Sequence, residues 1–178
     1  MPRVFGALPG PRNVPKEKQH LPNNQRNVTL SVTVLTEAAH LSELLPPGCA
    51  LEGEPLLTIT ISYMSNIGWL AGHGYAMFSV GFGISHSTPA QVKLSGPFKP
   101  VIWENLADPI VTGREELGFA KLYADLPPLL ILGDRCTALA AWKNFRFFEL
   151  SIDDLTDGPI PAPRSEGSTT SMSRRRGR

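Results

Sequence analysis

The sequence has few of the residues that cross-link a small protein or bind metals in it. It contains only two cysteines, Cys49 and Cys136, and four histidines that form no pair at the spacing of metal ligands. This composition argues against a zinc knuckle and a redox dithiol, and we expect both thiols to be buried and free. We therefore predict neither a metal nor a cofactor.

Long apolar runs and an excess of one charge are also absent. No stretch approaches the roughly 18 uncharged apolar residues of a membrane span, and the proline-rich N-terminus lacks the apolar core of a signal peptide. The formal charge is only +1, which gives no electrostatic case for nucleic acid or a membrane surface. We expect a soluble, cytoplasmic protein with neither of these as a partner.

Proline and glycine, in contrast, are plentiful. The 17 prolines and 16 glycines among 178 residues indicate many turns and short elements, which favours β structure over a helical bundle. We predict an extended N-terminal arm over residues 1–27 and one β domain over residues 28–155. Residues 156–178, which are rich in serine and arginine, are predicted to form a disordered basic tail.

Within the domain, apolar and polar residues alternate in several β-branched segments, a pattern typical of strands with one wet face. Strands are predicted at 28–34, 55–63, 74–82, 100–103, 110–112, 129–132, 138–142 and 145–150, with glycines marking bulges in 74–82. Thr36 is a predicted N-cap for a short helix over 37–45, and residues 104–109 a predicted loop. The expected fold is mainly β (α+β), antiparallel, with one or two short helices.

The segment from Gly113 to Lys121, GREELGFAK, is the most informative motif of the chain. Spacing and composition alone favour a surface lysine whose stem packs while its ammonium group stays in water. The segment resembles the signature of the acetoacetate decarboxylase family, in which Gly-Arg-Glu is followed, five residues after the arginine, by an aromatic-Pro-Lys group. Lys121 then matches the Schiff-base lysine of the family, Phe119 its aromatic residue, and Ala120 replaces the proline.

The resemblance covers roughly residues 27–155 and is closest to fungal members, some of which look like polyketide-pathway enzymes of secondary metabolism and toxin biosynthesis. It implies a β-barrel-like domain that is shortened at the C-terminus. Family members assemble, and a small β-rich core with a long arm leaves strand surface to cover, so we expect a homo-oligomer.

The chemistry that the resemblance implies is decarboxylation of a β-keto acid, in which the neutral amine of Lys121 forms an imine with the ketone. Two family features are missing. Leu122 stands where the family has a second lysine. The two acids of the family would fall near Thr60 and near Gly72 or His73, and none of these residues is an acid. Activation of the amine is therefore expected to depend on burial, which favours the neutral form of a lysine.

The roles of the neighbouring residues are less sharply defined. Arg114 is a candidate for orienting the substrate carboxylate, but it is equally suited to bracing the loop by pairing with Glu115 or Glu116. His73 is a candidate general base, although lone histidines are more often surface or packing residues. An apolar lining that accepts longer acyl chains than acetoacetate is expected from Phe78, Phe82, Phe119 and Leu122.

Three functions remain open at this level. The first is a lysine-dependent decarboxylase, a carbon–carbon lyase acting on a β-keto acid. The second keeps the Schiff base but performs aldol or dehydration chemistry, because the acids of the family are absent. The third is an inactive, truncated family member that serves as a binding or assembly subunit.

Overall fold

The computed structural model describes residues 25–88, 92–156, 158 and 169–173. Most of the predicted arm and much of the predicted tail lie outside these residues. The helical elements are α1 (Ala38–Ser42), the 3-10 turn η2 (Gly68–Leu70) and α2 (Ala107–Glu115). The strands are β1 (Arg26–Leu35), β2 (Cys49–Leu51), β3 (Leu56–Ser65), β4 (Tyr75–Ser87), β5 (Lys93–Glu104), β6 (Lys121–Tyr123), β7 (Leu130–Leu132), β8 (Arg135–Trp142), β9 (Phe145–Ile152) and β10 (Thr169–Ser173).

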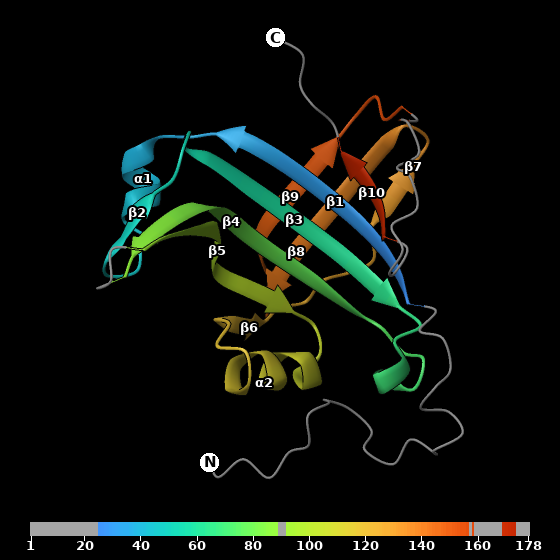
Figure 1. Ribbon diagram of the computed structural model, residues 1–178. Helices are drawn as coiled ribbons and strands as arrows, with labels where there is room; N and C mark the ends of the chain where they lie inside the picture. Colours follow the sequence, from blue (N-terminus) through green and yellow to red (C-terminus); the bar gives the residue numbers. More distant parts are fainter. Residues whose placement is uncertain (1–24, 89–91, 157, 159–168, 174–178) are drawn as a thin grey trace.

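These strands form two sheets, which confirms the predicted mainly β architecture. The larger sheet has the order β10-β1-β3-β4-β5-β6, with β2 paired to β4, and the smaller sheet has the order β7-β8-β9. Strands β1, β3, β4 and β5 run antiparallel, whereas β6 lies parallel to β5 and β10 parallel to β1. In Figure 1 the larger sheet curves across the view, with α2 below β6.

The apolar residues that alternate along β1, β3 and β4 share the face of the larger sheet that packs on the smaller sheet. Leu30 pairs with Ile61, and Ile61 pairs with Phe78. The ring of Phe78 stacks at 4.5 Å on Phe148 of β9 and at 5.0 Å on Trp103 of β5. The core therefore lies between the two sheets.

The opposite face of the larger sheet carries the alternate, mostly polar residues. Their hydroxyl groups meet in three cross-strand pairs between β1 and β3, namely Thr29–Ser62 at 3.0 Å, Ser31–Thr60 at 3.4 Å and Thr33–Thr58 at 3.0 Å. Successive strand partners continue the row of Thr60 through Ser79 and Ile102 to Lys121. Because strand partners project to the same face, Lys121 belongs to this polar face.

Two predictions around the motif are wrong. Residues 110–112, predicted as a strand, lie in α2, and the predicted loop at 104–109 instead contains the end of β5 and the start of that helix. Asp108 and Pro109 occupy the first turn of α2, where an acid complements the helix dipole and proline removes no intrahelical hydrogen bond. The β-branched pair Ile110 and Val111 suggested a strand, but this N-terminal signal outweighed it.

Other differences are smaller. The helix predicted at 37–45 is the shorter α1, whose N-cap is Glu37 and not Thr36. The predicted irregularity of the glycine-rich strand is confirmed by a register shift between Val80 and Phe82. Residues 169–173 form β10 within the predicted disordered tail.

The free thiols and the helices complete the description. Of the two free cysteines, Cys136 is buried and Cys49 is half-buried. None of the helices in the described part of the chain is long and apolar enough to cross a membrane.

Candidate active site

Lys121 is the first residue of β6, and its side chain is buried between the polar face of the sheet and α2. The residue is 9% exposed, so the expected burial is confirmed. Its Nζ donates a hydrogen bond to Glu104 Oε1 at 2.7 Å and another to the main-chain oxygen of Pro109 at 3.1 Å. The amine is therefore surrounded by protein and held from two sides.

Glu104 is the partner that the sequence analysis missed. It is the last residue of β5 and is fully buried. Its Oε1 contacts Lys121, and its Oε2 is buried with no hydrogen-bond partner among the described residues. Burial raises the pKa of the Glu104 carboxyl group above its usual value, and the neighbouring Lys121 opposes this shift without cancelling it.

The setting of Lys121 therefore differs from the expected apolar one. A signal for Glu104 was present, because Ile102 and Glu104 alternate with Val101 and Trp103 along one strand. The predicted loop at 104–109 began with Glu104, so this acid was not counted in the strand pattern. The structure thus has a buried acid in the site, Glu104. It does not lie at either of the two positions, near Thr60 and near Gly72 or His73, where the family resemblance placed an acid.

Helix α2 covers the side chain of Lys121. A Cβ atom added to Gly113 would lie 2.3 Å from Lys121 Cε and 2.7 Å from Nζ, distances at which atoms overlap. Glycine weakens a helix interior by about 1 kcal/mol relative to alanine. The space occupied by the lysine side chain accounts for a glycine at this position.

Arg114 near the end of α2 and Phe119 in the loop before β6 fix the main chain of Lys121. Arg114 Nη1 donates to the main-chain oxygen of Lys121 at 2.8 Å. The Phe119 main chain accepts from Lys121 N at 2.9 Å and donates to Gly113 O at 2.9 Å. Of the roles considered for Arg114, the observed contact is a brace, and it acts on the lysine main chain.

The other predicted site residues are more remote. Glu115 and His73 are exposed, the first at the end of α2 and the second between η2 and β4. Within the described residues, no hydrogen bond joins either side chain to Lys121 or Glu104. Phe119 contributes its main chain to the loop, and its side chain is 43% exposed.

The predicted apolar lining is wrong for Phe78 and Leu122, which belong to the face of the larger sheet opposite Lys121. Phe78 stacks in the core, and Phe82 is buried with its ring edge against Phe98. Phe78 faces the smaller sheet, away from Lys121. Leu122, which pairs with Trp103, also belongs to that face, although it is 49% exposed.

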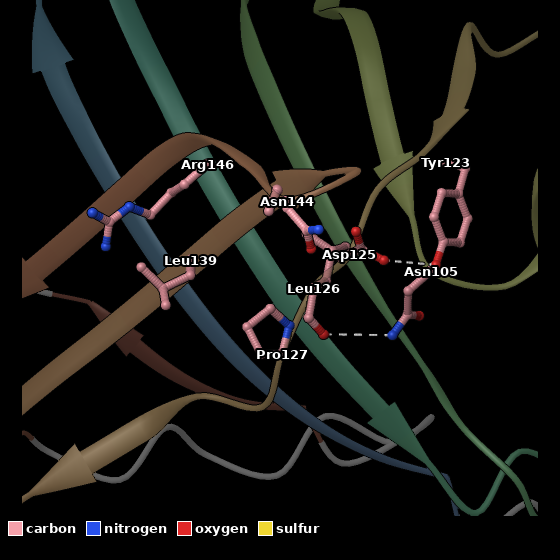
Figure 2. A pocket seen from close by; sticks show the side chains of 9 residues that line it. Asn105, Tyr123, Asp125, Leu126, Pro127, Leu139, Asn144 and Arg146 are labelled. Carbon is pink, nitrogen blue, oxygen red and sulfur yellow. Dashed lines mark hydrogen bonds between the residues drawn. The ribbon is translucent and has the colours of Figure 1, made fainter.

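A cavity of about 440 Å³ lies beside this site (Figure 2). Lys121 is not among the residues that line it, which are Asn105, Tyr123, Asp125, Leu126, Pro127, Leu139, Ala141, Asn144 and Arg146. Hydrogen bonds from Tyr123 to Asp125 at 2.8 Å and from Asn105 to the Leu126 main chain at 3.5 Å cross its wall.

Nowhere in the described residues do three His, Cys, Asp or Glu side chains form a group that could hold a metal ion.

The Lys121–Glu104 pair can exchange a proton over a single hydrogen bond. Transfer from the ammonium group to the carboxylate would leave a neutral amine, which is the nucleophilic form. The raised pKa of Glu104 makes that transfer less costly than it would be with a solvent-exposed carboxylate. The geometry would suit imine formation, because an acid or base is in direct contact with the amine.

Comparison with known proteins gives a consistent result. A family model described as acetoacetate decarboxylase matches residues 9–170. One solved acetoacetate decarboxylase superposes with a TM-score of 0.60 at 16% identity, over 74% of this chain and 49% of that one. The acetoacetate decarboxylase of Legionella pneumophila superposes with a TM-score of 0.58 at 16% identity, over 81% of this chain and 51% of that one.

The chain therefore spans about half the length of these solved structures. At 16% identity the two superpositions establish the fold alone. No curated protein sequence matches the chain.

Proposed function

The chain belongs to the acetoacetate decarboxylase family, and from that premise we propose that it decarboxylates a β-keto acid through an imine on Lys121. The observation that carries this proposal is the buried contact of 2.7 Å between Lys121 Nζ and Glu104 Oε1. A lysine whose only task was solubility would have its ammonium group in water. Here the amine lies under a helix against an acid of raised pKa.

Glu104 takes over the activation that the resemblance assigned to a second lysine. Leu122 occupies that lysine's position and belongs to the other face of the sheet. A neighbouring cation would favour the neutral amine by repulsion, whereas Glu104 favours it by accepting the proton. Each arrangement provides the uncharged nucleophile that imine formation requires.

Decarboxylation then follows from the electronic properties of the imine. The neutral amine adds to the ketone, and loss of water gives an iminium ion next to the carbon that bears the carboxylate. The bond to CO2 breaks and its electron pair moves into the iminium, giving an enamine. Forming the iminium returns to the nitrogen the proton that Glu104 had accepted, so Glu104 takes up a proton from water before it protonates the enamine carbon. Water then releases the ketone and the free amine.

We propose a substrate chain longer than that of acetoacetate, such as a polyketide-derived acid. Exposed apolar side chains flank the lysine in sequence, including Leu117 at 63% and Phe119 at 43% exposed. Such residues could cover an acyl chain that extends from the site.

Borohydride reduction in the presence of a medium-chain β-keto acid tests the proposal. We expect a reduced adduct on the peptide that contains Lys121, release of CO2, and loss of both in Lys121→Ala. Lys93→Ala is the matched control, because Lys93 also pairs with a glutamate, Glu52 at 2.8 Å, but is exposed. Absence of any adduct on the folded wild-type chain would overturn the covalent mechanism and favour a binding or assembly role.

A further inference from the structure

The two oxygens of Glu104 have different surroundings. Oε1 accepts a hydrogen bond from Lys121 Nζ at 2.7 Å, whereas Oε2 is buried and has no partner in the described part of the chain. Leaving a buried polar atom unpaired is costly, because the atom gives up its hydration without gaining a hydrogen bond. A ligand group that donates a hydrogen bond to Oε2 would recover this energy.

The position of Oε2 restricts which group that is. In the iminium formed from a β-hydroxy ketone, three carbons separate the nitrogen from the hydroxyl oxygen, so both can face one carboxylate. The iminium N–H would donate to Oε1 and the hydroxyl group to Oε2, the two-point contact that a carboxylate accepts well. A substrate carboxylate at the same place would be repelled by ionised Glu104.

We propose that Lys121 and Glu104 also cleave β-hydroxy ketones by a retro-aldol reaction, with Glu104 as the base that removes the hydroxyl proton. This inference rests on the imine chemistry of the proposed function. It adds a requirement, because CO2 leaves without giving up a proton, whereas an aldehyde leaves only after its hydroxyl group is deprotonated. The unpaired Oε2 provides the acceptor for that proton.

The steps balance in atoms and protons. The Lys121 amine and the ketone lose water, and the proton that Glu104 accepted from the lysine returns to the nitrogen, which gives the iminium and ionised Glu104. Glu104 takes the hydroxyl proton, the bond between the α- and β-carbons breaks, and its electron pair moves into the iminium to give an enamine and a free aldehyde. Protonated Glu104 returns the proton to the enamine carbon, and water hydrolyses the imine to a ketone and the free lysine.

Tyr75 provides a second polar group on this face. It lies two residues before Met77 on β4 and therefore on the same face, and Met77 is the strand partner of Glu104. Burial, together with the negative charge of Glu104, raises the pKa of Tyr75 to about 12. Its phenol is therefore neutral at ordinary pH and keeps its proton as a hydrogen-bond donor.

The experiment uses the full chain and 4-hydroxy-4-phenylbutan-2-one, a β-hydroxy ketone whose cleavage releases benzaldehyde, which is followed by its ultraviolet absorbance. We expect wild-type protein to release benzaldehyde and acetone in equal amounts. Glu104→Gln should slow adduct formation on Lys121, because the amine loses its proton acceptor, and should lower the rate of cleavage per adduct formed about 10²–10⁴-fold, the usual range for loss of a general base. The control Glu52→Gln alters an exposed glutamate that also contacts a lysine and should cleave at the wild-type rate.

Each outcome decides between the two proposals. If wild-type protein forms the Lys121 adduct and releases CO2 from a β-keto acid but gives no benzaldehyde, this inference is overturned and the proposed function stands. If no adduct forms with either substrate, both are overturned. Cleavage by folded Glu104→Gln at the wild-type rate overturns the role of Glu104, and the wild-type measurement decides the activity even if this variant does not fold.

Discussion

Two lysine–glutamate pairs in this molecule have nearly the same length and different surroundings. Lys121 and Glu104 meet at 2.7 Å with side chains 10% and 0% exposed, and Lys93 and Glu52 meet at 2.8 Å with side chains 58% and 38% exposed. Water screens the exposed pair, so its contribution to stability is small. The two residues of the buried pair have lost their hydration, and each depends on the other for charge neutralisation. Burial, and not distance, distinguishes the site from the surface.

Breaking each pair is the strongest test of this comparison. Lys121→Met leaves the Glu104 carboxylate buried without its partner, which should lower the free energy of unfolding by about 3–5 kcal/mol and abolish adduct formation. Combining it with Glu104→Leu should restore most of the stability but none of the activity. Urea denaturation monitored by circular dichroism measures these differences.

The matching changes at the exposed pair are the control for that test. Lys93→Met and Glu52→Leu, alone or together, should shift the urea midpoint little and leave adduct formation intact. A loss of stability as large as that of Lys121→Met would contradict the proposed difference between the pairs.

Displacing the lysine without changing its chemistry is the next test. Gly113→Ala places a methyl group where Lys121 Cε and Nζ now lie, so the amine must move away from Glu104. A misplacement of about 1 Å can reduce a rate by about 10²-fold, and we expect a loss of that order in decarboxylation. Val111→Ala, on an exposed position of the same helix, should keep the wild-type rate.

Opposite pH dependences should distinguish the two acids. Burial raises the pKa of Glu104, so its contribution to stability is complete below the unfolded value of 4.5 and is lost as the pH rises through the folded pKa. The hydrogen bond from Lys93 lowers the pKa of Glu52, so its contribution is present above 4.5 and is lost as the pH falls through the folded pKa.

Unfolding free energies measured for wild type, Glu104→Gln and Glu52→Gln between pH 3 and 7 provide the test. Relative to wild type, Glu104→Gln should gain stability as the pH rises, whereas Glu52→Gln should lose stability as the pH rises. Parallel curves for both variants would show that the two acids do not differ as described.

Salt should have the smallest effect. Added salt weakens interactions between exposed charges far more than between buried ones. The coupling energy between Lys93 and Glu52 in a double-mutant cycle should therefore decrease from about 0.05 to about 1 M sodium chloride. The coupling energy between Lys121 and Glu104 should stay nearly constant. Equal sensitivity in both cycles would argue that water reaches the buried pair.

The sequence predicted the sheet better than the site. Alternation alone located β1 and β3, because residues such as Leu30 and Ile61 lie on the one face that packs in the core. Pattern reasoning failed where two signals competed, as at Ile110, where β-branching indicated a strand but the helix-start signal of Asp108 and Pro109 determined the structure. Lys121 was found only through the family motif, since its local composition is also typical of a surface lysine.

Glu104 was missed for a different physical reason. Its partner is 17 residues away in sequence and reaches it only because β6 lies parallel to β5, beyond the intervening helix. A parallel pairing of a three-residue strand leaves almost no periodic signal. Contacts that depend on such a crossover require the tertiary structure.

The length of β6 has a consequence for how the protein would lose activity. This strand has three residues, and in the described structure its strand partner is β5. Short segments at a sheet edge open locally at a lower free energy than the strands in the middle of the sheet. On warming, the amine should become exposed to solvent protons while β3 and β4 remain paired. Activity should then fall at a lower temperature than the β-sheet signal, and amide hydrogens of β6 should exchange before those of the core.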